Sequence, residues 1–131
     1  MKRKWQRVFI IGNGGSYANA QHIQNDLLSV GVPAFTLDSA TLTAFANDFS
    51  YETVFSRWLE VVGEKGDLLI ALSGSGKSPN ILKACRTAKR LGMKVVKLFG
   101  ATMGLDMQQS EERQIVFGHN LMRKIRAYQS R

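Results

Sequence analysis

Two loops rich in glycine and serine constrain this sequence more than any other feature, because each lies between a short apolar run and a helical pattern. The loops are Gly12–Ser16, after the apolar run 7–11, and Ser73–Ser78, after the apolar run 67–72. A short apolar run bounded by turn residues is typical of a strand buried on both faces. Strands that alternate with helices predict a three-layer α/β fold, with a parallel sheet between two helical layers.

The rest of the chain continues this alternation as far as Gly100. Two more strands are expected over 34–37 and 94–98, and helices are expected over 17–30 (with Ser16 as N-cap), 39–46, 51–62 and 79–91. A turn is expected at Asn47-Asp48. Beyond Gly100 the periodicity weakens, and we expect a last strand over 114–117 and a short basic helix over 119–131. The chain is predicted to be a single domain, 1–131, with its core at about 7–100.

The composition is that of an ordinary globular protein, with 44% hydrophobic and 21% charged residues. No apolar run approaches the roughly 18 residues that a membrane span needs. The apolar run after the basic N-terminus is too short for a signal peptide. The single cysteine, Cys85, cannot form an internal disulfide. Together these features predict a cytoplasmic protein with no membrane contact.

The formal net charge of +8 comes from the two ends of the chain. Four basic residues lie in the first seven positions and four more lie between 123 and 131, while the other ten basic residues balance the ten acidic ones. This distribution is typical of solvated termini, with an anionic partner as the alternative. Direct nucleic-acid binding is not expected, because the excess of basic residues lies in two terminal segments and does not form one basic face.

The two loops have the composition of a phosphate site. Glycine lets the backbone approach a ligand closely, the helix start offers free N–H groups, and serine hydroxyls add further donors. The plainer alternative is a pair of tight turns with helix caps. In a parallel sheet both loops lie at one edge and can converge on one ligand. Tyr17 breaks the G-x-G-x-x-G dinucleotide motif and Ala71 breaks the P-loop motif, so no nucleotide is expected.

A histidine and a carboxylate follow the first loop. His22 and Asp26 are four residues apart, so they share one face of the expected helix. The pair could transfer protons or hold a metal, or it could be a surface interaction only. Asn47 and Asp48 could donate and accept hydrogen bonds from sugar hydroxyls, or could form a turn only.

These motifs, in this order, resemble those of the sugar isomerase (SIS) domain, and specifically its phosphoheptose isomerase branch. The similarity covers about residues 7–100. It is carried by Gly12-Asn13-Gly14-Gly15-Ser16, Ala20-x-His22, Leu42-Thr43-Ala44-x-Ala46-Asn47-Asp48, Tyr51-Glu52-x-Val54-Phe55-Ser56-Arg57, Gly66-Asp67-Leu68-Leu69-Ile70, Ser73-x-Ser75-Gly76-x-Ser78-Pro79-Asn80 and Gly92-Met93-Lys94-Val95.

The resemblance implies a flavodoxin-like fold without a nucleotide and a homo-oligomer, a dimer or a tetramer, with sites at subunit interfaces. It implies interconversion of sedoheptulose 7-phosphate and a heptose 7-phosphate, on the path to lipopolysaccharide or capsule heptose. It also implies the roles of individual residues. His22 would bind zinc, Asp26 would act as base or metal ligand, and the phosphorylated sugar would be bound by Asn13, Gly14, Gly15, Ser16, Asn47, Asp48, Ser73, Gly74, Ser75 and Ser78.

The sequence departs from the family pattern at several positions. Asp26 replaces the usual Glu and is one methylene shorter, Gly74 replaces Thr, and Lys77 replaces Asn. The family's N-terminal helical segment and its C-terminal Arg-Ile-Gln-Glu-x-His motif are not recognised, so we expect a chain truncated at both ends with a divergent segment at 101–131. His119 is not expected to complete the metal site, which would leave the zinc site incomplete.

Three hypotheses follow. In the first, Asp26 removes a proton from the open-chain sugar phosphate, His22 acts as acid or holds a metal, and an enediolate is reprotonated at the neighbouring carbon. In the second, the chain binds a sugar phosphate or a protein without catalysis, as the branch of the family that binds the bacterial replication initiator does. In the third, the chain is a remnant without function.

Overall fold

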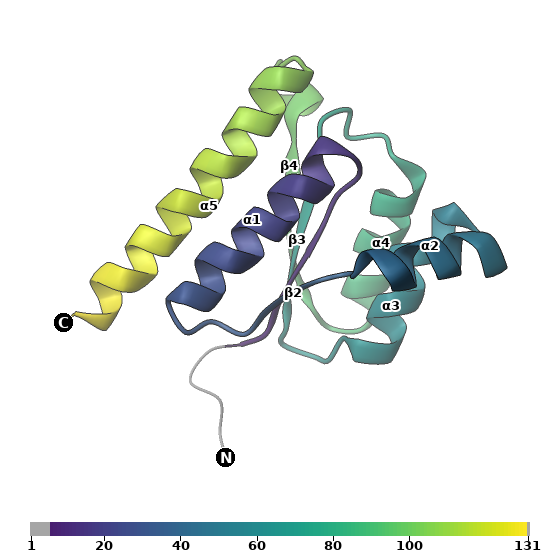
Figure 1. The fold of residues 1–131 in the computed structure, drawn as a ribbon, viewed down its shortest axis with the longest axis horizontal. Coiled ribbons are helices and arrows are strands. Elements are labelled where there is room, and N and C mark those ends of the chain that lie inside the picture. The colour runs from purple at the N-terminus through teal and green to yellow at the C-terminus, as the bar shows by residue number, and fades with distance from the viewer. Residues whose placement is uncertain (1–5, 131) are drawn as a thin grey trace.

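A computed structural model, which describes residues 6–130, contains one parallel four-stranded sheet in the order β2-β1-β3-β4 (Figure 1). The strands are β1 (Val8–Ile11), β2 (Ala34–Thr36), β3 (Leu68–Ser73) and β4 (Lys94–Phe99). In register, Val8 lies opposite Ala34 on one side and Leu68 on the other. The predicted parallel α/β sheet is confirmed, and its order is that of the first four strands of a flavodoxin-like fold.

Within residues 6–130, five α-helices cover the two faces of this sheet. They are α1 (Gly15–Ser29), α2 (Ser39–Asp48), α3 (Val54–Val62), α4 (Pro79–Arg90) and α5 (Met107–Gln129), with short 3₁₀ turns at Tyr51–Thr53 and Gly100–Met103. Figure 1 shows α1 and α5 side by side on one face and α2, α3 and α4 on the other. The predicted three layers are therefore confirmed.

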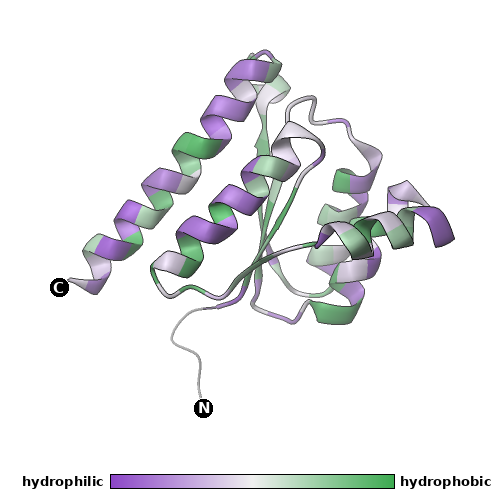
Figure 2. Cartoon of the chain, viewed as in Figure 1, coloured by the Kyte–Doolittle hydropathy of each residue, from purple (hydrophilic) through white to green (hydrophobic). Residues whose placement is uncertain are grey.

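The core consists of two apolar clusters, one on each face of the sheet. Because side chains alternate along a strand, Phe9 and Leu69 face α3 and α4, whereas Ile10 and Ile70 face α1. Figure 2 shows the strands as mostly hydrophobic and α5 as largely hydrophilic with a few apolar residues between. Cys85 of α4 belongs to the first cluster, and burial raises the pKa of its thiol. This cysteine is therefore a core residue and not a nucleophile.

A buried ion pair ties the start of β1 to the start of β3. Arg7 Nη2 lies 2.7 Å from Asp67 Oδ2 and also donates to the Val62 carbonyl at 2.7 Å. The Asp67 carboxylate, whose side chain is 1% exposed, also accepts from the Glu64 N–H at 2.9 Å. This carboxylate is thus fully removed from water and depends on protein donors.

The C-terminal segment differs most from the sequence prediction. Residues 114–117 were expected to form a strand, but they lie inside α5, a helix of 23 residues. The helix starts with a capping box between Asp106 and Gln109. Its apolar residues recur at spacings of three or four and pack against the cluster beside α1, which a strand could not do.

α1 and α5 run in the same direction in close contact. A Cβ at Gly118 would lie 2.7 Å from Ile23 Cγ1, so glycine allows the two helices to approach at this point. Toward the two ends of the contact between α1 and α5, Asn19 donates to the Glu111 carbonyl and the Ser29 hydroxyl lies 3.7 Å from Met122 Sδ. The packing fixes which side chains of α5 face α1. Among the residues that the structure describes, no helix has the length and hydropathy to cross a membrane.

Candidate functional site

The two glycine- and serine-rich loops lie next to each other at one edge of the sheet. β1 and β3 are direct neighbours and parallel, so the loops that follow them leave the sheet on the same side. Between them lies a cavity of about 290 Å³, lined by both loops and by Met107 and Glu111 of α5. The predicted residues Asn13, Gly14, Gly15, Ser16, Ser73, Gly74, Ser75 and Ser78 all line it.

The second loop gathers three hydroxyl groups. Ser73 Oγ accepts from the Gly76 N–H at 3.0 Å, and Ser75 Oγ accepts from the Lys77 N–H at 3.1 Å. Ser73 Oγ also lies 3.4 Å from Ser78 Oγ. Gly76 has φ 69°, a conformation that glycine adopts without strain. The loop thus folds around its own serines and points their hydroxyls to one place.

The start of α1 is open to the cavity. Gly14, not Ser16 as predicted, occupies the N-cap position, and no side chain caps the helix. Ser16 is instead buried within the first turn, where its Oγ accepts from Gln114 Nε2 at 3.0 Å. An uncapped helix start carries a partial positive charge and offers free N–H groups, so this end of the cavity favours an anion.

Asn13 links the two loops. It exchanges two amide hydrogen bonds of 2.9 Å with Asn80 in the first turn of α4, and its Oδ1 also accepts from the Tyr51 hydroxyl at 2.7 Å. Asn80 is 2% exposed. This reciprocal pair holds the first loop at a fixed distance from the second. Asn80 and Tyr51 were not predicted as site residues from the sequence.

α2 contributes to the surroundings of the site through its first turns. Ser39, Leu42 and Thr43 line a cavity of about 170 Å³ with Gly14 and Tyr17. The Tyr17 hydroxyl donates to the Leu37 carbonyl at 2.6 Å, and burial, with the nearby Asp38 carboxylate, raises the pKa of Tyr17. Asp38 caps α2 by accepting from the Thr41 N–H, and this hydrogen bond lowers the pKa of Asp38.

Asn47 and Asp48 do not reach either cavity. The predicted turn at these positions is wrong, because both residues belong to the last turn of α2. They are exposed and hydrogen-bond to each other, with Asn47 Nδ2 3.1 Å from Asp48 Oδ1. The helix continues through them because Phe45 and Ala46 keep packing against the core.

Three metal-ligating side chains meet between α1 and α5. His22 Nε2 lies 3.1 Å from His119 Nε2, and each of these nitrogens lies 3.5 Å from Asp26 Oδ2. All three ligand atoms fall within 4.8 Å of one another. Asp26 Oδ2 is buried and has no hydrogen-bond partner. The expectation that His119 stays outside the site is wrong, because α5 brings it onto the face that carries His22.

This donor set fits a zinc ion. Zinc in proteins is held by histidine nitrogens and carboxylate oxygens, and many catalytic sites use three protein ligands and leave one position open. A buried carboxylate oxygen without a donor is costly unless a cation or a proton satisfies it. We therefore describe His22, Asp26 and His119 as a candidate metal centre.

A chain of polar side chains leads from the cavity along α1 toward the candidate metal centre. Gln114 is 1% exposed, donates to Ser16, and accepts from Asn19 Nδ2 at 2.8 Å. Asn19 lies one turn before His22 on the same side of α1. Gln114, like Glu111 and His119, was missed because its role depends on how α5 packs, and the polar sequence around it gives no local signal.

The profile of the SIS domain family matches residues 3–100 of this chain. The chain belongs to the SIS domain family. Among curated proteins, it is 46% identical over 112 residues to a phosphoheptose isomerase of Chlorobaculum parvum, a match that covers 78% of this chain and 54% of that protein. It is 49% identical over 102 residues to a phosphoheptose isomerase of Burkholderia pseudomallei, covering 72% of this chain and 52% of that protein.

Solved structures of two phosphoheptose isomerases superpose on this SIS domain. The phosphoheptose isomerase of Neisseria gonorrhoeae gives a TM-score of 0.85 at 28% identity, covering 93% of this chain and 77% of that one. The phosphoheptose isomerase of Francisella tularensis gives 0.84 at 30% identity, covering 93% and 76%. The predicted SIS fold is confirmed. The chain spans about half the length of the curated relatives that it matches.

Proposed function

We propose that this chain binds a phosphorylated sugar between its two loops and interconverts the ketose and aldose forms, with sedoheptulose 7-phosphate and a heptose 7-phosphate as the pair. One observation carries the proposal: an uncapped helix start and three serine hydroxyls face one cavity of about 290 Å³. The similarity to phosphoheptose isomerases supports the choice of sugar.

The phosphate group fits best against the second loop. Ser73 and Ser75 each accept a backbone N–H, so their hydroxyl protons remain to be donated to phosphate oxygens. Gly14, where an added Cβ would meet no atom within 4 Å, leaves room for the sugar to reach the N–H groups of α1. Contacts from α2 would come from Ser39 and Thr43, which line the adjoining cavity. The contact of Asn47 and Asp48 with the sugar stays a prediction from the resemblance.

Zinc would be held by His22, Asp26 and His119, and when bound it would supply a Lewis acid that polarises a sugar oxygen. As a base, a carboxylate takes a proton from the hydroxyl-bearing carbon beside the carbonyl, which leaves an enediolate. A proton then passes from the oxygen on that carbon to the former carbonyl oxygen, and the carboxylic acid returns its proton to the former carbonyl carbon, which gives the aldose. The proposed base is Asp26, as predicted from the sequence, and the alternative is that Asp26 is a metal ligand. A carboxylate oxygen that coordinates the zinc cannot also take the proton, so one oxygen of Asp26 can serve in only one of these roles.

Binding without turnover is the second candidate function. It is favoured by one observation, namely that none of His22, Asp26 and His119 is among the residues that line the cavity. In that case the chain would sense a sugar phosphate, or bind a protein, as the branch that binds the replication initiator does. The basic termini would suit an acidic partner. A cytoplasmic location and a single domain over 1–131 also belong to the proposal, and they rest on the composition and the length of the chain. The proposed homo-oligomer rests on the resemblance.

An isomerase assay on the purified chain tests the proposal. Sedoheptulose 7-phosphate should be converted by the wild-type chain loaded with zinc, and Asp26→Asn should reduce the rate at least about 100-fold. Thermal stabilisation by the sugar phosphate is measured on both proteins. Stabilisation without turnover would support binding as the only function. If the sugar phosphate neither stabilises the chain nor is converted, both proposed functions are contradicted.

Ser78→Ala is expected to weaken binding of the sugar phosphate about tenfold. A hydrogen bond to a charged group contributes about 1.5–3 kcal/mol. Among the described residues, the only side chain that shares a hydrogen bond with the Ser78 hydroxyl is Ser73, at 3.4 Å, so the loss of this hydroxyl leaves the loop folded. Calorimetric titration with sedoheptulose 7-phosphate gives the dissociation constant. Ser130→Ala, at the far end of α5, is the matched control and should bind as the wild type does. Equal affinity in both variants would exclude Ser78 from the phosphate site.

Glu111→Gln is expected to tighten binding of inorganic phosphate a few-fold. Glu111 is the only carboxylate among the described residues that line the cavity, and a Cβ added at Gly15 would clash with it. A negative charge at this position competes with a phosphate for the helix start. Titration with phosphate at pH 7 measures the change, and Glu112→Gln on the exposed side of α5 is the control. Weaker binding in Glu111→Gln would show that the carboxylate holds the ligand indirectly.

A further inference from the structure

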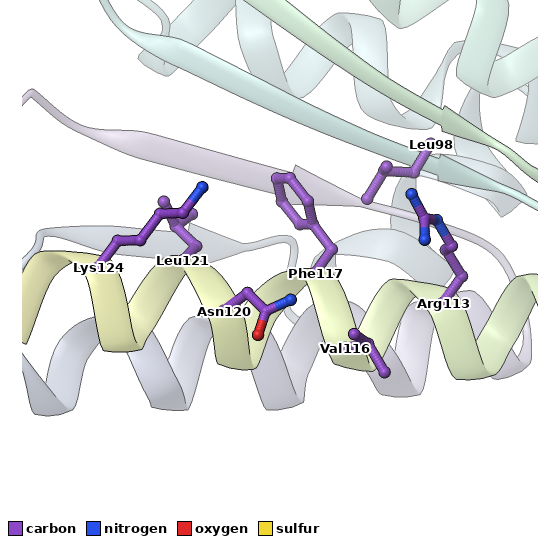
Figure 3. A pocket seen from close by; sticks show the side chains of 7 residues that line it. All are labelled: Leu98, Arg113, Val116, Phe117, Asn120, Leu121 and Lys124. Carbon is purple, nitrogen blue, oxygen red and sulfur yellow. The ribbon is translucent and has the colours of Figure 1, made fainter.

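Gln114 is a buried amide on the packed side of α5. Figure 3 shows Phe117 and Leu121, one and two turns further along this helix, pointing toward the strands, with Leu98 of β4 near them. Residues three and seven positions apart share one side of a helix, so Gln114 faces the interior as well. Its side chain is 1% exposed and reaches the first turn of α1. An amide buried in this way needs protein groups to satisfy its hydrogen bonds.

The orientation of the Gln114 amide is fixed by the main chain. The Asn19 side chain lies 3.0 Å from the Glu111 carbonyl, which can only accept a hydrogen bond, so the Asn19 atom that faces it is the donor Nδ2. The same Nδ2 donates to the Gln114 side chain at 2.8 Å, so the Gln114 atom that faces Asn19 is the acceptor Oε1. The other end of this amide, the donor Nε2, therefore lies against Ser16 Oγ at 3.0 Å.

This orientation decides what the Ser16 hydroxyl can do. A hydroxyl has one proton to donate, and the Gln114 nitrogen that donates to Ser16 Oγ cannot accept that proton in return. Within residues 6–130, no group accepts a hydrogen bond from the Ser16 hydroxyl. Ser16 lines the cavity between the two loops. Its proton is therefore left for a ligand that enters this cavity.

We propose that Gln114 is a positioning residue of the sugar-phosphate site, which orients the Ser16 hydroxyl so that it donates a hydrogen bond to an oxygen of the bound sugar phosphate. This inference rests on the proposed function. Phosphate oxygens accept hydrogen bonds, so a hydroxyl that is already oriented as a donor binds them at a smaller cost in conformational entropy. Gln114 is not among the residues that line the cavity, so it acts through Ser16 and does not touch the ligand.

The test measures the affinity for sedoheptulose 7-phosphate by calorimetric titration at pH 8. Gln114→Met keeps a side chain of similar length but removes the donor, and it should weaken binding about fivefold, the effect expected when one neutral hydrogen bond is lost. Gln114→His should bind within about twofold of the wild type. At this pH a neutral imidazole has one nitrogen that accepts, for Asn19, and one that donates, for Ser16. Gln108→Met, at an exposed position of α5, is the matched control and should bind as the wild type does.

A double-mutant cycle shows whether Gln114 acts through Ser16. Gln114→Met should weaken binding about fivefold in the wild-type background and less than about twofold in the Ser16→Ala background, where no hydroxyl remains to be oriented. A role in packing alone would instead lower the affinity by the same factor in both backgrounds.

Two outcomes overturn the inference and leave the proposed function in place. In one, the wild-type chain binds the sugar phosphate but Gln114→His binds it no better than Gln114→Met. In the other, Gln114→Met weakens binding equally with and without the Ser16 hydroxyl. If the wild-type chain binds no sugar phosphate, the proposed function is contradicted and the inference fails with it.

Discussion

His119→Ala is expected to remove tightly bound zinc from the chain and to lower isomerase turnover at least about 100-fold. His119 Nε2 lies 3.1 Å from His22 Nε2 and 3.5 Å from the buried Asp26 Oδ2, so its loss takes one of three ligands from the candidate metal centre. Zinc content after gel filtration and the rate with sedoheptulose 7-phosphate are the two measurements.

Asn120→Ala is the control for this experiment, because Asn120 is the next residue of α5 and is exposed. It should keep both zinc and turnover, whereas His22→Ala should lose both. If His119→Ala retains one zinc per chain, the metal centre is not where we place it. If zinc is lost and the rate is unchanged, the ion is structural and the isomerase does not depend on it.

Arg7→Met is expected to lower the free energy of unfolding by about 3 kcal/mol, because it leaves a buried carboxylate without its cation. Asp67 has a side chain that is 1% exposed, and Arg7 lies 2.7 Å from it. The same substitution also removes the hydrogen bond from Arg7 to the Val62 carbonyl. For a chain of this length, thermal unfolding should shift down by about 10 °C, as measured by circular dichroism.

Arg90→Met gives the matched control. Arg90 Nη2 lies 2.8 Å from Glu60 Oε1, but both side chains are more than half exposed, so this pair should contribute less than about 1 kcal/mol. The double variant Arg7→Met/Asp67→Asn should recover part of the stability, because it no longer buries a charge. If Arg7→Met and Arg90→Met lower the free energy of unfolding equally, burial of Asp67 does not increase the contribution of its ion pair to stability.

The predicted βα alternation was confirmed because it rests on local patterns. The central strands β1 and β3 are short apolar runs, and each loop of the site contains the glycines and serines that its turn requires. The convergence of the two loops was also predictable, since neighbouring parallel strands end at one edge of a sheet. The confirmed family resemblance rests on the same segments, 3–100.

The segment after Gly100 could not be predicted in the same way. The run Ile115-Val116-Phe117 is β-branched and aromatic, which favours a strand when it is considered alone. Packing of Phe117, Leu121 and Ile125 against the sheet and α1 outweighs that local preference and keeps the segment helical. Asn47 and Asp48 are a second example, because packing of α2 extends the helix through a pair that is common in turns.

The sequence by itself therefore determined the sheet and the two loops that line one cavity, because strands, glycine turns and helix starts are specified by residues close together in the chain. Only the tertiary structure decided that His119 meets His22 and Asp26, that Gln114 contacts Ser16, and that Glu111 faces the cavity. These contacts span more than ninety residues, and they depend on which face of α5 packs against α1, which no local pattern encodes.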